Sequence, residues 1–230
     1  MSRLFTLLLS ITLLAGVAGE RAGQPRADDT VTLQVTVSRI AVVSDSYTTG
    51  TKEGGEGDRG WPTRAWQTLA RSGTPVMADV AAEGGAGYAT RGNRGNVFED
   101  LAARAVKPDD DLVVFFGSRN DEKVEPAILS VMVYGVFQMA RRTAPTARFL
   151  IIGPAWPTAD PPPAILRIRD TLAYQAQLAK ADFVDPIALR WFVDEPELIG
   201  KDGVHPTDDG HIYLADKIAP LIAGRLPRHI

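Results

Sequence analysis

Short apolar runs rich in β-branched residues alternate along the chain with longer segments of helical periodicity, and this alternation constrains the fold most. The predicted strands cover residues 35–43, 76–82, 112–116, 148–152 and 183–184. The predicted helices cover residues 63–71, 97–106, 126–142, 164–179 and 207–223. Strands that alternate with helices form a parallel sheet covered by helices on both faces. The sequence therefore predicts an α/β fold, a three-layer α/β/α sandwich with a central parallel sheet.

The N-terminus carries one basic residue, Arg3, followed by a mostly apolar run over residues 4–18 that closes with small residues. This run is short for a bilayer span and has the length of a signal-peptide core. We expect residues 1–19 to be a signal peptide or an uncleaved N-terminal anchor, residues 20–34 a flexible lead-in, and residues 35–230 the folded domain. The expected location is secreted or in the cell envelope of a bacterium.

Composition removes several classes of function. The 230 residues include no cysteine, which excludes disulfides, zinc–thiolate sites, iron–sulfur clusters and a thiol nucleophile. The net charge of −3 gives no electrostatic footprint for nucleic acid, so we expect no nucleic-acid partner. Only three histidines are available as general bases near neutral pH.

Polar clusters follow three of the predicted strands and precede the last predicted helix. They occupy residues 44–47, 83–87, 117–121 and 202–206. In a parallel sheet, ligands bind beyond the carboxyl ends of the strands, so these clusters are expected along one edge. Together they hold a hydroxyl, a glycine amide, a carboxamide, an imidazole and a carboxylate, which are the groups that acyl transfer requires.

A serine hydroxyl becomes a nucleophile only when a base removes its proton, and Ser46 is the candidate in the first cluster. His205 is the best-placed base, because His229 stands at the chain end and His211 lies within the last predicted helix. Asp202 precedes His205 by three residues, so a turn can aim its carboxylate at the imidazole Nδ1 and stabilise the imidazolium.

These residues and their order resemble the SGNH or GDSL hydrolases. The resemblance maps the nucleophile to Ser46, the base to His205 and the acid to Asp202. It implies an oxyanion hole made by the backbone N–H of Ser46, the backbone N–H of Gly85 and the side-chain amide of Asn120. It also implies the SGNH-hydrolase version of a flavodoxin-like sheet.

Two residues depart from the family pattern, which usually has glycine where this chain has Ser44 and Ser118. The resemblance implies no metal and no organic cofactor, and substrates among lipid esters, short acyl esters and O-acetylated sugars. We therefore expect an exported serine hydrolase that cleaves lipid or short-chain carboxylic esters through an acyl-enzyme, with contact to a membrane surface as a further expectation. The alternatives are a carbohydrate O-acetyl esterase acting on cell-envelope glycans and, less favoured, a non-catalytic envelope-binding protein.

Three arginines, Arg91, Arg94 and Arg119, flank the predicted site. The ordinary interpretation is that they are solvated or paired, and the alternative is that they recognise an anionic or polar acyl substrate. Arg119 and Trp156 are the candidates for substrate binding. Asp45 is expected to cap nearby amides rather than to act as an acid.

Two other site classes compete. Gly55, Gly57 and Gly60 match the dinucleotide-binding pattern G-x-G-x-x-G, but they start about a dozen residues after the strand and acidic residues crowd them. A metal hydrolase would need His205 and His211 to converge with Asp202 or Asp208, but the helical pair of H-E-x-x-H is missing. No G-x-S-x-G elbow of an α/β-hydrolase occurs in the sequence.

Overall fold

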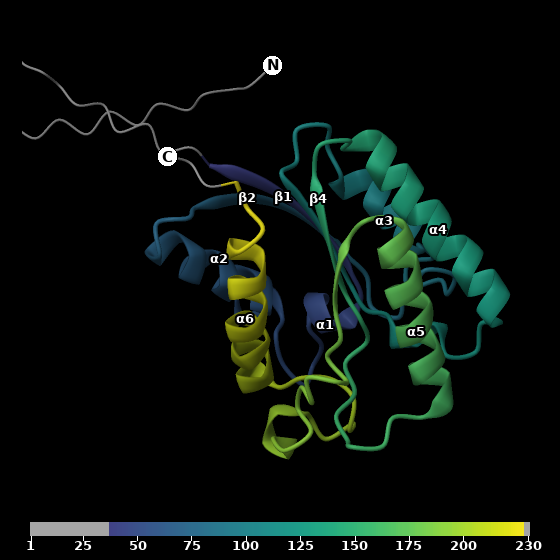
Figure 1. Ribbon diagram of the computed structural model, residues 1–230. Helices are drawn as coiled ribbons and strands as arrows, with labels where there is room; N and C mark the ends of the chain where they lie inside the picture. The colour runs from purple at the N-terminus through teal and green to yellow at the C-terminus, as the bar shows by residue number, and fades with distance from the viewer. Residues whose placement is uncertain (1–36, 228–230) are drawn as a thin grey trace, which may run out of the picture. The chain divides into compact units, whose positions relative to one another are not determined.

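The computed structural model describes residues 37–227, and the predicted signal segment, the whole predicted lead-in and His229 lie outside this range. The described part contains a five-stranded sheet in the order β2-β1-β3-β4-β5, in which every neighbouring pair is parallel (Figure 1). The strands are β1 (Ser38–Ser44), β2 (Val76–Ala82), β3 (Leu112–Phe116), β4 (Arg148–Ile152) and β5 (Asp182–Val184). The predicted three-layer α/β fold is confirmed.

Six α-helices and three short 3₁₀ helices connect the strands in the described part. The α-helices are α1 (Ser46–Thr49), α2 (Trp61–Arg71), α3 (Phe98–Ala105), α4 (Pro126–Thr143), α5 (Pro163–Leu178) and α6 (Asp208–Ala223). The 3₁₀ helices are η1 (Gly57–Arg59), η2 (Arg119–Asp121) and η3 (Pro196–Leu198). The five predicted helices are present, with ends that differ by one or two residues. Helix α2 begins at Trp61 because Pro62 fits the first turn, where its missing N–H has no partner to lose.

Helices cover both faces of the sheet, α2 and α6 on one side and α3, α4 and α5 on the other (Figure 1). Alternate residues of β1 serve the two layers, since Ile40 and Val42 pack in one buried cluster and Ala41 and Val43 in the other. This two-sided burial explains why the strands are continuous apolar runs in the sequence. No helix within residues 37–227 is both long and apolar enough to cross a membrane.

The register brings the carboxyl ends of three strands together. Ser44 at the end of β1 is level with Ala82 of β2 and with Phe116 of β3. The loops that follow these strands therefore start side by side at one edge of the sheet. The segment before α6 reaches the same edge, because Tyr47 of α1 contacts Val204 there.

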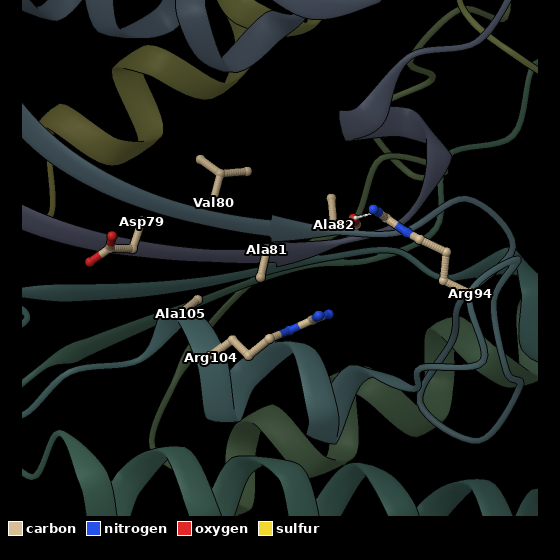
Figure 2. A pocket seen from close by; sticks show the side chains of 7 residues that line it. All are labelled: Asp79, Val80, Ala81, Ala82, Arg94, Arg104 and Ala105. Carbon is tan, nitrogen blue, oxygen red and sulfur yellow. Dashed lines mark hydrogen bonds between the residues drawn. The ribbon is translucent and has the colours of Figure 1, made fainter.

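Strand β2 forms one margin of the sheet, and a groove of about 300 Å³ lies between it and α3 (Figure 2). Arg104 of α3 and Arg94 of the loop after β2 border this groove. None of the predicted catalytic residues lines it, so the groove is separate from the candidate site described next.

Candidate active site

Ser46 is the first residue of α1, directly beyond the carboxyl end of β1. Asp45 caps this short helix, and its Oδ1 accepts the N–H of Tyr47 at 2.9 Å. The cap agrees with the expectation that Asp45 is structural, and it fixes the start of the helix whose first residue is Ser46. In the part of the chain that the structure describes, the backbone N–H of Ser46 donates to no acceptor.

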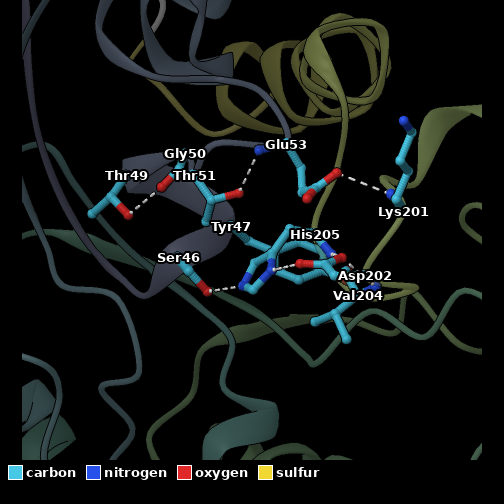
Figure 3. Close-up of polar contacts among 10 residues, drawn as sticks. All are labelled: Ser46, Tyr47, Thr49, Gly50, Thr51, Glu53, Lys201, Asp202, Val204 and His205. Carbon is cyan, nitrogen blue, oxygen red and sulfur yellow. Dashed lines mark hydrogen bonds and ion pairs between the residues drawn. The ribbon is translucent and has the colours of Figure 1, made fainter.

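A continuous chain of hydrogen bonds joins Ser46, His205 and Asp202 (Figure 3). The Ser46 Oγ lies 3.0 Å from His205 Nε2, although the two residues are 159 positions apart. His205 Nδ1 lies 2.6 Å from Asp202 Oδ2. The structure thus brings the three predicted catalytic residues into the arrangement of a serine–histidine–aspartate triad.

The second oxygen of Asp202 shapes the loop that carries His205. Asp202 Oδ1 accepts the backbone N–H groups of Val204 and His205, each at 2.9 Å. Partial burial acts to raise the pKa of Asp202, but the hydrogen bonds from the imidazole and the two amides outweigh it and lower the pKa to about 2. The carboxylate is therefore ionised at neutral pH and can stabilise a positive imidazolium.

Tyr47 ties α1 to the catalytic loop, a contact that the sequence did not reveal. Its hydroxyl donates to the carbonyl oxygen of Val204 at 2.6 Å, and its ring packs against Phe116 and Phe192. Burial raises the pKa of Tyr47 well above its usual value, so the hydroxyl keeps its proton and remains a donor. Tyr47, the residue after Ser46, thus fixes the position of the loop that carries His205.

Gly85 lies in the loop after β2 with a positive φ of 78°, a conformation that favours glycine. A Cβ added there would come within 3.3 Å of the Asn93 side chain. Among the described residues, no acceptor receives the Gly85 N–H. Gly85 and Ser46 therefore each present an unused amide donor.

The side-chain amide of Asn120 is held by contacts within the protein. Its Nδ2 donates to the carbonyl oxygen of Ala86 at 2.8 Å and makes a longer contact of 3.4 Å with Asp45 Oδ2. The sequence predicted the Asn120 side-chain amide as an oxyanion-hole donor, and in the structure its Nδ2 has two contacts within the protein. The 3.4 Å contact with Asp45 is beyond the usual hydrogen-bond length, so it is the weaker of the two contacts of this amide.

Asp121 joins the loop after β2, which carries Gly85, to the segment of Asn120, a contact that sequence reasoning missed. Its buried carboxylate accepts the backbone N–H groups of Tyr88, Ala89 and Thr90 at 2.7, 3.0 and 2.9 Å. Burial raises the pKa of Asp121, and these three hydrogen bonds oppose the rise. Two loops that carry oxyanion-hole candidates are thereby held as one unit.

The two serines that replace family glycines have hydrogen-bonding roles. The Ser118 hydroxyl donates to the carbonyl oxygen of Ala86 at 2.9 Å and accepts the N–H of Asn120 at 3.0 Å. The Ser44 hydroxyl accepts the hydroxyl of Thr48 at 2.7 Å. The two serines that depart from the family pattern therefore add hydrogen bonds around the site.

The predicted substrate-binding pair is in contact. The Arg119 guanidinium lies over the Trp156 ring, 4.4 Å from its centre. Arg91 and Arg94 are instead exposed and bond within the loop that carries them. Arg91 and Arg94 therefore follow the ordinary interpretation, in which the flanking arginines are solvated or paired.

Gly55, the first glycine of the pattern Gly55, Gly57 and Gly60, packs against α6. A Cβ at Gly55 would overlap the imidazole of His211, and the Gly55 N–H donates to Asp208 at 2.8 Å. The loop therefore lies against the start of α6, far in sequence from the strand turn that a dinucleotide fingerprint needs.

His211 is buried, and its Nδ1 accepts the N–H of Trp61 at 3.3 Å. Burial lowers the pKa of His211 to about 4. Within residues 37–227, no three histidine, aspartate or glutamate side chains gather in a way that could hold a metal ion.

The chain matches a known family over most of its length. The profile of the GDSL-like lipase/acylhydrolase family matches residues 45–212. A protein of Mycobacterium tuberculosis (strain ATCC 25618 / H37Rv) named GDSL lipase Rv0518 is 57% identical over 229 residues, which cover 98% of this chain and 99% of that protein.

The fold also matches solved structures. TesA superimposes with a TM-score of 0.66 at 22% identity, over 82% of this chain and 100% of that one. The acetyl xylan esterase AlAXEase gives a TM-score of 0.65 at 18% identity, over 80% of this chain and 99% of that one. At such low identity the likeness shows a shared fold.

The lowered pKa of His211 predicts a loss of stability in acid. A base whose pKa is about 4 when folded and 6.5 when unfolded stabilises the folded state above pH 6.5, and this stability is lost as the pH falls from 6.5 to 4. The loss amounts to about 3 kcal/mol. Urea unfolding across this range should show a weaker pH dependence for His211→Gln than for the unaltered protein. Parallel curves for the two proteins would contradict this account of His211.

Proposed function

Because the chain belongs to the GDSL-like lipase/acylhydrolase family and is a carboxylic ester hydrolase, we propose that it cleaves its ester with Ser46, His205 and Asp202 through an acyl-enzyme. The observation that carries this proposal is the unbroken sequence of contacts from the Ser46 hydroxyl to the Asp202 carboxylate, 3.0 Å and then 2.6 Å long. A hydroxyl, an imidazole and a carboxylate in this order are what acyl transfer to serine needs.

In the first half of the proposed reaction, the Ser46 Oγ attacks the ester carbonyl carbon while His205 Nε2 takes its proton. The carbonyl electron pair moves onto the oxygen, and Asp202 stabilises the imidazolium through Nδ1–H. Collapse of the tetrahedral intermediate breaks the bond to the alcohol, which leaves with the proton from Nε2. Water then attacks the acyl-enzyme with His205 as base, the acid departs, and the proton returns to Ser46.

The negative oxygen of the tetrahedral intermediate needs donors that are already in place. The amides of Ser46 and Gly85 fit this role because they have no acceptor within the described residues. Asn120 supplies the third donor when its hydrogen leaves the 3.4 Å contact with Asp45 for the substrate. The Ala86 and Asp121 contacts hold the carboxamide side chain and its loop in place during this exchange.

The proposed substrates are lipid or short-chain acyl esters, and the proposed location is outside the cytoplasm or in the envelope. The name of the 57% identical relative, a GDSL lipase, supports lipid esters. A carbohydrate O-acetyl esterase acting on envelope glycans is the second candidate, supported by the fold shared with an acetyl xylan esterase. A series of esters of increasing acyl length, run beside a panel of acetylated sugars, separates the two.

Replacing Ser46 tests the proposed mechanism. Ser46→Ala should abolish hydrolysis of 4-nitrophenyl butyrate while the melting temperature changes little.

In the same series, Asn120→Ala should lower kcat by about 10²- to 10³-fold with a smaller change in KM, because the donor acts mainly in the transition state. Full activity of Ser46→Ala would remove the nucleophile from the proposal, and an unchanged kcat would remove Asn120 from the oxyanion hole.

Tyr47 should act as a positioning residue for His205. Tyr47→Phe removes the 2.6 Å hydrogen bond to Val204 and should lower kcat about tenfold while KM changes less, because the imidazole is no longer held at its working distance. Tyr134→Phe is the matched control, since it deletes a tyrosine hydroxyl from the exposed side of α4. Equal kinetics for the two variants would show that the contact does not position His205.

A further inference from the structure

Arg119 borders the same small cavity as Asp45 and Tyr47, the two chain neighbours of Ser46, and its guanidinium has no carboxylate partner among the described residues. It begins η2 and directly precedes Asn120. In the described part of the chain, no aspartate or glutamate oxygen forms an ion pair with its guanidinium. An arginine in a site that handles esters, and that no acidic side chain neutralises, is available for a ligand.

The packing around Arg119 holds the guanidinium in place. It stacks over Trp156 at 4.4 Å from the ring centre. It also borders a small cavity of about 10 Å³ together with Asp45, Tyr47 and Gly117. Tyr47 follows the nucleophile in the chain and contacts the loop that carries His205, so the guanidinium lies at the margin of the candidate active site.

The carboxylates nearest to the reacting groups are already occupied. Asp45 is buried and accepts the Tyr47 N–H, with Asn120 at 3.4 Å. Burial raises its pKa to about 6, which weakens it as a counter-charge. Asp202 bonds the His205 ring and two backbone amides. Neither is an ion-pair partner of Arg119.

The other two flanking arginines differ from Arg119. Arg91 donates to the carbonyl oxygen of Gly95 at 2.6 Å, and Arg94 donates to that of Ala82 at 3.3 Å. Arg94 also has Glu83 at 3.9 Å. Arg91 and Arg94 have carbonyl or carboxylate partners in their own surroundings. Arg119 instead stacks on the Trp156 ring and has the neutral Tyr47 hydroxyl as its polar neighbour, so its positive charge is not neutralised by an acidic side chain of the described residues.

We propose that Arg119 binds an anionic group of the substrate, a carboxylate or a phosphate, so that the preferred esters carry a negative charge close to the scissile bond. The planar fork of arginine offers two parallel donors to such a group, and stacking on Trp156 reduces the rotamer freedom lost on binding. This inference rests on the proposed function, because it names the substrate class of the same site.

The test compares matched neutral and anionic esters. For a charge on the acyl side, the pair is 4-nitrophenyl hexanoate and the mono-4-nitrophenyl ester of adipic acid. For a charge on the alcohol side, the pair is 4-methylphenyl acetate and 4-acetoxyphenylacetate. The unaltered protein should favour the anionic member of at least one pair in kcat/KM, and this preference should shrink as salt is added. The pair that shows the preference identifies the side of the ester that faces Arg119.

Substitutions then assign the preference to Arg119. Arg119→Gln should reduce the ratio of kcat/KM for the anionic ester to that for the neutral one about tenfold, and Arg119→Lys should reduce it less because the charge remains. Arg167→Gln, which removes an equal charge from an exposed position of α5, should leave the ratio unchanged.

Two results would overturn the inference. One is the absence of any salt-sensitive preference for the anionic esters in the unaltered protein. The other is an equal loss on both members of each pair in Arg119→Gln, which would mean that Arg119 serves only packing. Hydrolysis of the neutral esters that depends on Ser46 would leave the proposed function intact in either case, so the two failures are distinguishable.

Discussion

Parallel strands that end at the same level leave their following loops at one edge of the sheet, and the candidate active site depends on this register. Ser44 lies level with Ala82 and with Phe116, so three polar segments begin side by side. A shift of one residue in β1 would turn every apolar side chain of the strand to the opposite layer and would move the start of α1, where Ser46 lies. The two-sided burial of β1 and β3 opposes such a shift, and the hydrophobic core thereby fixes the position of the nucleophile.

Buried polar groups then convert this coarse placement into a defined geometry. Asp45 caps the helix of Ser46, and Asp121 fastens the two loops that supply Gly85 and Asn120. A buried carboxylate costs free energy unless hydrogen bonds satisfy it, so each of these groups favours the one loop conformation that provides its donors. The same burial raises the pKa of both carboxylates, and the hydrogen bonds from the backbone amides oppose the rise.

The sequence predicted the sheet, its helices and the four polar clusters because these features depend on local patterns. Periodicity shows which segments are buried, and it predicted a last helix over residues 207–223, where the structure has α6 with Thr207 as its N-cap. The same reasoning could not find the contact of Tyr47 with Val204, which joins residues 157 positions apart. The contacts of Asp121 with the amides of residues 88–90 could not be predicted for the same reason, since in the sequence a buried carboxylate with three amide partners looks like an ordinary turn residue.

The glycines show that a local pattern can also match a motif that the structure does not use. The spacing of Gly55, Gly57 and Gly60 fits a nucleotide motif, yet Gly55 is small because the His211 ring lies against it. Such a requirement is set by a helix more than a hundred residues later, so spacing alone cannot distinguish it from phosphate binding. Ser118 is a further example, because only the structure shows that its hydroxyl links Ala86 with Asn120.

The proposed mechanism requires that His205 activate the hydroxyl of Ser46. Treatment with a serine-directed phosphonate, followed by peptide mass spectrometry, tests this most directly because the reagent forms a covalent bond only with an activated serine. The account predicts a single label on Ser46, lost in His205→Ala. A label on another serine, or continued ester hydrolysis by fully labelled protein, would contradict it.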